Sequence, residues 1–174
     1  MKIFKFIQVL CLVSGLNLLT ACSNMPPSTP SGQSNWQTLD QILPNFRGAD
    51  VQVMTNARHY QVGDPIRFQI TSSKAGKLWI IEVNQQDRVS VIFPHQKQAN
   101  NIILANTPMM IPDSSWGVNL QAAEPRGQSQ VAFIVTPIDK TLEDVVQIDN
   151  GKLAAVAFPT NSDWGIQRVY LEIK

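Results

Sequence analysis

The feature that most constrains the fold is a two-residue alternation of apolar and more polar side chains, which runs from Asp50 toward the C-terminus. Successive side chains of a β-strand point to opposite faces, so this period indicates strands with a buried face. The alternating apolar positions are Val51/Val53, Ile66/Phe68/Ile70, Trp79/Ile81/Val83, Val89/Val91/Phe93, Val118/Leu120/Ala122, Val131/Phe133/Val135, Leu153/Ala155/Ala157 and Val169/Leu171/Ile173.

Turn sequences separate these segments, and Asp149-Asn150-Gly151 is typical of a tight hairpin. With almost no helical period between the strands, the pattern predicts an all-β fold. We expect an antiparallel β-sandwich of about seven to nine strands over residues 50–174. Residues 140–147 fit either a helical turn or a frayed strand.

A short helix is predicted over residues 36–43, within a helix-and-connector segment at 36–49. Apolar residues at 36, 39, 42, 43 and 46 follow helical spacing, and Pro44 limits its continuation. This helix either packs on the domain or is exposed as a partner-docking helix. Packing is favoured because a short isolated helix is marginal in water.

The N-terminal 21 residues have the pattern of a cleaved signal peptide. Lys2 and Lys5 lie at the start of an apolar run, as in the basic start of a signal peptide. At its end, Leu19-Thr20-Ala21-Cys22 resembles a bacterial lipobox. This resemblance implies cleavage before Cys22 and lipidation of its thiol. The alternative, an uncleaved transmembrane helix over residues 3–21, is disfavoured by five polar residues in that run: Lys5, Gln8, Ser14, Asn17 and Thr20. Ser23 after the cysteine, as in similar enterobacterial lipoproteins, favours the outer membrane.

Residues 22–35 combine the lipidated cysteine with a tether. The segment is rich in proline and serine and contains no charge, so we expect it to be disordered and extended. Its thirteen residues after Cys22 reach at most about 40 Å. Loss of Lys2 and Lys5 leaves 12 basic against 13 acidic residues, and the arginines are scattered singly, which argues against nucleic-acid binding.

Cysteine and histidine are too scarce for several kinds of chemistry. Cys11 leaves with the signal and Cys22 is used by the lipid, so the folded part has no thiol for disulfides or catalysis. The only histidines, His59 and His95, lack partners at a zinc-like spacing, and we expect no metal and no other cofactor.

Several segments together resemble domain of unknown function 4384 over roughly residues 50–140. They are Tyr60–Asp64, Gly76–Ile81, Val91–Pro94, Asn101-Ile102, Ile111-Pro112, Pro125–Gly127 and Val131–Val135. The resemblance implies an immunoglobulin-like sandwich that acts as an accessory or interaction domain, and it brings no catalytic residues. His95 and the segment Gln85–Arg88 depart from the family pattern, which bears on turns more than on the fold.

We therefore expect no enzyme and assign no catalytic residue. A serine hydrolase would need a converging Ser, His and Asp, and a glycosidase two placed carboxylates. Glu82 lies inside a strand whose alternation aims it away from the core, as a solvated charge. A hydrolase using His95 or Glu124 is the least favoured reading.

We favour a binding function over catalysis, with Met109, Met110, Trp116 and Trp164 as possible partner or ligand contacts. Loops on rigid sandwiches carry function, and methionine and tryptophan suit adaptable contacts. For the loop Ala105–Trp116 itself, we favour the alternative that it caps one end of the sandwich. We expect an outer-membrane lipoprotein that binds an envelope protein; the other option is a glycan or small-ligand binder that stacks ligands on Trp79, Trp116 or Trp164.

Overall fold

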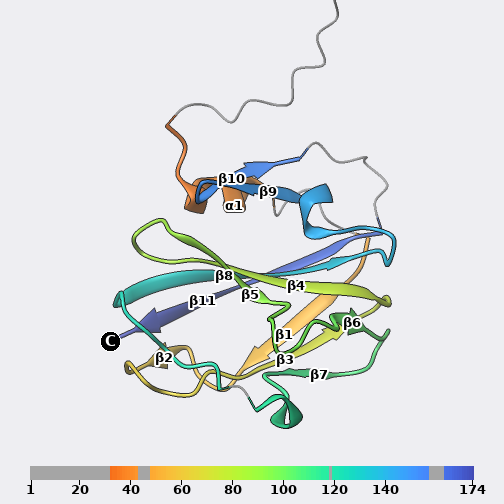
Figure 1. The fold of residues 1–174 in the computed structure, drawn as a ribbon, viewed down its shortest axis with the longest axis horizontal. Helices are drawn as coiled ribbons and strands as arrows, with labels where there is room; N and C mark the ends of the chain where they lie inside the picture. The colour runs from red at the N-terminus through yellow and green to blue at the C-terminus, as the bar shows by residue number, and fades with distance from the viewer. Residues whose placement is uncertain (1–31, 43–47, 118, 157–162) are drawn as a thin grey trace, which may run out of the picture.

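The computed structural model describes residues 32–42, 48–117, 119–156 and 163–174, and these form three layers (Figure 1). The signal peptide, Cys22 and most of the tether lie outside the described residues. Within the described ranges, no helix is both long enough and apolar enough to cross a membrane.

Two sheets build the sandwich. The small sheet has the order β1-β3-β7, and the large sheet has the order β2-β11-β8-β4-β5, with β6 as an extra partner of β4. All pairs are antiparallel except β2 with β11. The small-sheet strands are Val51–Thr55 (β1), Phe68–Ser72 (β3) and Met109–Ile111 (β7). The large-sheet strands are His59–Tyr60 (β2), Gly76–Val83 (β4), Val89–Phe93 (β5), Ile102–Ile103 (β6), Gly127–Thr136 (β8) and Gly165–Ile173 (β11).

The sandwich core lies between these two sheets. Phe68 of β3 packs edge-on against Phe133 of β8, with ring centroids 4.9 Å apart. Leu78 and Ile80 of β4 are buried in the same cluster, as are Leu171 and Ile173 of β11. The predicted all-β sandwich is confirmed.

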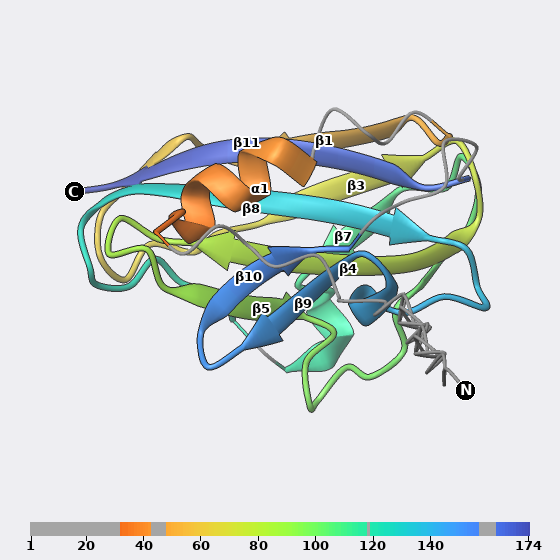
Figure 2. The same ribbon diagram turned by 90° about the horizontal axis from the view of Figure 1, so that it is seen from above.

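A third layer covers the other face of the large sheet. It consists of the helix α1 (Asn35–Ile42), the 3-10 turn η3 (Leu142–Asp144) and the hairpin of β9 (Val146–Asp149) and β10 (Lys152–Ala155). Seen from above, α1 lies over β8 and β11, while the hairpin lies over β4 and β5 (Figure 2). Buried residues of this layer form a second apolar cluster with the sheet: Leu39, Ile42, Leu142, Val145, Val146 and Leu153 pack with Ile81, Val83, Ala132, Ile134 and Trp164.

The helix predicted over residues 36–43 forms as α1, and it packs on the domain. Its N-terminus is held by a hydrogen-bonded clamp around Asn35, whose side chain is buried. The carboxylate of Asp87, in the β4–β5 turn, accepts the amides of Asn35 and Trp36 at 3.0 Å each. The Asn35 amide group donates to the carbonyls of Asp87 and Gly151, and its oxygen accepts the Leu153 amide at 2.9 Å. The clamp joins the start of α1 to two turns far along the chain.

The third layer changes the predicted strand faces. Because it is present, β4 and β8 are buried on both sides, and Ile81 and Val83 face α1 and the hairpin instead of the sandwich core. In β5 an irregularity between the pairs Ile81–Val91 and Ile80–Phe93 moves Phe93 to the sandwich face. The predicted two-residue period of β4 is therefore confirmed. The apolar residues Ile81 and Val83, however, belong to the second cluster and not to the sandwich core.

The strand predicted at 118–122 does not form as such. Val118 lies outside the described residues, and Gln121 makes only an isolated bridge with Pro65. The Ile66 amide donates to the Leu120 carbonyl at 2.8 Å. Residues 120–122 thus lie beside the segment leading into β3 and continue the line of β7. The described residues between them include the 3-10 turn η2 (Ser114–Trp116).

Two predicted turns are confirmed. Gly63 has φ of 94°, a value that glycine adopts without strain, and the Asp64 carboxylate accepts the Gln61 amide at 2.7 Å. Asn150 and Gly151 have φ of 47° and 74° between β9 and β10, as a two-residue hairpin turn requires. The segment 140–147 contains both of its predicted alternatives, since η3 is followed directly by the start of β9.

Candidate functional site

Of the residues predicted to contact a partner, Met109, Met110 and Trp164 do not come together on one surface. Met109 is half-buried against the sandwich core, whereas Met110, the next residue in β7, is 41% exposed on the outer face of the small sheet. Trp164 is only 6% exposed and belongs to the second apolar cluster, so its predicted role as a surface contact is wrong. The predicted loop Ala105–Trp116 contains β7, and the buried Ile111 ties it to the core.

The other predicted residues have different outcomes. Cys22 and the side chain of Trp116 lie outside what the structure describes, so lipidation and a Trp116 contact stay predictions. The Trp79 indole donates to the Thr136 hydroxyl at 3.1 Å and packs against the second cluster, which removes it as an open stacking platform.

The structure instead places a groove along one side of the sandwich. There β5 and β7 are the last strands of their sheets, and residues of both strands line one cavity. Two cavities of about 380 Å³ and 180 Å³ lie on this side, and they adjoin because Ile92 and Leu120 line both. We call them together the edge groove. The larger cavity alone falls within the size range of ligand pockets, roughly 300–1,000 Å³.

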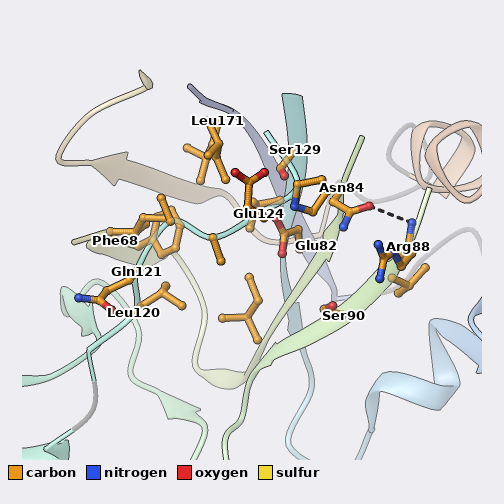
Figure 3. A pocket seen from close by; sticks show the side chains of 18 residues that line it. Phe68, Glu82, Asn84, Arg88, Ser90, Leu120, Gln121, Glu124, Ser129 and Leu171 are labelled. Carbon is orange, nitrogen blue, oxygen red and sulfur yellow. Dashed lines mark hydrogen bonds between the residues drawn. The ribbon is translucent and has the colours of Figure 1, made fainter. Parts of the chain in front are cut away.

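The edge groove has an apolar wall and a polar end (Figure 3). Phe68, Leu120 and Leu171 line the wall with Ile66, Ile92 and Ile173. At the polar end, Figure 3 shows Glu82, Asn84, Glu124 and Ser129 close together. A ligand with an apolar part and a polar head would match this division.

Glu82 is the main departure from the predicted site. Its predicted position was away from the core, but Glu82 lines the larger cavity together with Phe68 and Val131, on the sandwich face of β4. It stands opposite Ser90 of β5 and Val131 of β8. The prediction failed because Ile81 and Val83 serve the second apolar cluster, so their intervening residue faces the groove.

The strand β5 offers a free edge beside this groove. Within the described residues no strand pairs with its outer side, and its neighbour across the groove is the edge of the small sheet. The Asn84 amide donates to the Arg88 carbonyl at 3.0 Å, and alternate pairs of an antiparallel ladder are bonded. The amides of Val89 and Val91 therefore point toward the open side, where an added strand would meet them.

The two histidines and Glu124 do not share one cavity. His59 pairs with Glu172 at the surface, with Nε2 and Oε2 3.1 Å apart. His95 lines the smaller cavity, whereas Glu124 lines the larger one and bonds Arg126, with 3.1 Å between Oε1 and Nε. In the described part of the chain, histidine, cysteine, aspartate and glutamate form no group of three suited to a metal ion.

The segment 112–117 after β7 has its own local hydrogen bonds. Asp113 begins η2, and its carboxylate accepts the Ser115 hydroxyl at 2.6 Å and the Ser115 amide at 2.8 Å. The hydroxyl bond, followed by the amide bond, lowers the pKa of Asp113 below its ordinary value, because both favour the charged carboxylate. These bonds explain Asp113 as a structural cap.

Residues 59–138 match the family model described as "Domain of unknown function (DUF4384)". Among curated proteins and solved structures, none matches the chain. The matched segment contains β4, β5 and β8, and with them most of the polar end of the edge groove. It leaves out β1, α1, the β9–β10 hairpin and β11. The resemblance suggested by the sequence is thus confirmed as a DUF4384 domain at residues 59–138 of this chain.

Proposed function

We propose that this protein is a non-catalytic lipoprotein of the outer membrane whose sandwich binds another envelope protein, as an accessory of a secretion or surface assembly. The binding mode is the addition of an extended partner segment to the free edge of β5. The observation that carries this proposal is the pairing of that edge with an open groove.

The edge supplies affinity and the groove supplies selectivity. An added strand gains main-chain hydrogen bonds to β5, and alternate side chains of that strand would enter the edge groove. The apolar wall is already built from residues that pack against the sandwich core, such as Ile92 and Leu120, so the partner would extend an existing core. An open strand edge without such a use is an aggregation hazard that proteins usually cover.

Anchoring would strengthen a weak contact of this kind. A lipid on Cys22 and a tether of at most about 40 Å would hold the domain near the membrane, and confinement raises the effective concentration of a membrane partner. The start of α1 lies against the β4–β5 turn, so the tether would enter the domain next to the beginning of β5, at Val89.

Crosslinking in intact envelopes tests the proposal. Val91→Pro removes one outward amide of β5 and should abolish capture of the partner that the unaltered chain recovers. Val62→Pro is the matched control, because Val62 is 43% exposed and Val91 46%. If Val91→Pro lowers the free energy of unfolding, Val89→Pro serves as the second edge variant. Equal capture by both edge variants and the control would contradict the proposal.

A second candidate function is the binding of a cell-wall glycan or small ligand, which the size of the larger cavity favours. Cosedimentation with purified peptidoglycan and a tryptophan-fluorescence titration distinguish it from protein binding. Because Trp79 and Trp164 are committed to internal contacts, stacking on either is not part of this candidate. Cosedimentation that survives Val91→Pro would favour the glycan over an added strand.

A further inference from the structure

We propose that the edge groove selects a lysine or arginine side chain of the added partner strand. This inference rests on the proposed function, and it names the chemistry that the polar end of the groove would recognise. The cation would meet Glu82, and its aliphatic stem would lie along the apolar wall.

The first observation is an unused hydroxyl. Ser129 is 2% exposed, yet among the described residues its side chain has no hydrogen-bond partner, and it lines the larger cavity. Figure 3 places it beside Glu82 and Glu124 at the polar end. Because Ser129 lines the cavity and its side chain makes no hydrogen bond to the described part of the chain, its hydroxyl oxygen is available to a ligand donor.

The second observation is an unpaired charge. Glu82 is half-buried and takes part in no ion pair within the described part of the chain, although an unpaired carboxylate is costly to remove from water. The one cationic side chain that lines the same cavity is Arg88. Its guanidinium bonds Gln86, and its own main chain bonds Asn84, so it stays at the rim.

The balance of charge selects the sign of the ligand. The larger cavity is lined by two carboxylates, Glu82 and Glu124, and by one guanidinium, that of Arg88. Glu124 already bonds Arg126, which leaves Glu82 as the carboxylate to be neutralised. The ammonium or guanidinium group of such a ligand would donate several hydrogen bonds and accept none. The Glu82 carboxylate and the Ser129 hydroxyl oxygen are matching acceptors.

The apolar wall explains why the cation should be a side chain of a peptide. Lysine and arginine cover apolar surface with their stems while the head reaches a polar partner. Ile92 lies in β5 itself, so a strand added at this edge would bring its inward side chains directly over the wall. A side chain entering there passes Ile92 and Leu120 before it meets Glu82.

The test uses the ¹⁵N-labelled full chain and four acetylated, amidated pentapeptides, Thr-Val-Xaa-Val-Thr, where Xaa is lysine, arginine, norleucine or glutamate. The lysine and arginine peptides should shift the amides of Val89, Ser90 and Val91 together with those of Glu82 and Ser129. The norleucine peptide should bind about tenfold more weakly, since it keeps the stem but loses the charge-assisted bond.

Variants locate the effect. Glu82→Gln should remove the preference for lysine over norleucine, while Glu143→Gln, an exposed control on η3, should leave it unchanged. Ser129→Ala should weaken lysine binding several-fold and serves as the second variant if Glu82→Gln does not fold. Butylammonium chloride alone should bind at least tenfold more weakly than the lysine peptide, because it cannot pair with β5.

The outcomes separate the two proposals. If all four peptides shift the β5 amides with equal affinity, the charged pocket is overturned while strand addition stands. If no peptide shifts the β5 amides, strand addition falls with it. Butylammonium binding as tight as the lysine peptide would overturn the assignment to a peptide side chain and indicate a free amine ligand.

Discussion

The clamp at the start of α1 makes a strong prediction about stability. Asn35 is 1% exposed and its side chain makes three hydrogen bonds to the main chain of Asp87, Gly151 and Leu153. Asn35→Ala removes all three at once. The Leu153 amide, which is buried, would then lack its acceptor, and the helix would lose its connection to the β9–β10 turn.

The expected loss in the free energy of unfolding is about 3 kcal/mol. A typical intramolecular hydrogen bond contributes about 1 kcal/mol, and a donor left buried without a partner makes the loss larger. Domains of this size have a stability of about 5–15 kcal/mol in total, so the change removes a substantial part of it. Removal of the surface ion pair between Lys152 and Asp87, 3.7 Å apart, would have a much smaller effect.

Urea unfolding followed by circular dichroism measures the effect. Asn119→Ala is the matched control, because Asn119 is exposed and its side chain makes no hydrogen bond within the described residues. It should change stability by no more than about 0.5 kcal/mol. A second variant, Asp87→Asn, tests the carboxylate that accepts the first two helix amides; asparagine tolerates the φ of 59° at that position. It should lose about 1 kcal/mol.

The reasoning would be refuted if Asn35→Ala lost less than about 1 kcal/mol, or no more than Asn119→Ala. A lower slope of free energy against urea would show instead that α1 had already separated from the sheet before unfolding. In that case limited proteolysis should cut within α1 in the variant but not in the unaltered chain.

Three other measurements test separate features. Cys22→Ser should abolish incorporation of radiolabelled palmitate and release the chain from the membrane fraction. In a carboxyl titration by NMR, Asp113 should show a pKa below its ordinary value, and Ser115→Ala should return that pKa toward the ordinary value. The stability that Asp113 gives η2 is therefore present above the unfolded-state pKa and is lost as pH falls through the folded-state pKa. Gly76→Ala should destabilise the chain by about 2 kcal/mol in urea unfolding, because the added Cβ would lie 2.2 Å from the Thr136 carbonyl oxygen.

The alternation predicted strands well wherever one face is apolar. β1, β3 and β11 form where Val51, Phe68 and Leu171 mark the period. The two-residue period of a strand is a local property of the backbone, so it can be found without knowing what covers each face. The same holds for the turns at Gly63 and Asn150-Gly151, where local conformation decides the residue type.

The third layer could not be predicted in the same way. A strand buried on both faces has a continuous apolar run, and such a run does not say which residues belong to which core. In Trp79–Val83 the more apolar phase was assigned to the sandwich, although it serves the second cluster. Glu82 was misplaced for the same reason, and with it the polar end of the edge groove.

The groove itself depends on contacts between distant segments. It exists because the small sheet ends at β7, whose line along the sheet is broken after Ile111 and resumes at residues 120–122. No local sequence pattern predicts that break, because residues 118–122 alternate in the same way as a strand. In the sequence, the one signal of the groove was Glu82, a charged residue among the apolar residues of its strand.

The groove and the third layer follow from one asymmetry of the fold. The large sheet is wider than the small one, so the small sheet covers only part of its sandwich face. On the opposite face, α1 and the β9–β10 hairpin complete the cover, and both lie outside the segment matched by the family model. On the sandwich face β5 stays open, within the matched segment. A partner strand added at β5, as proposed, would complete the sandwich face as the flanking segments complete the other face, and the strand that it would join lies within the matched segment.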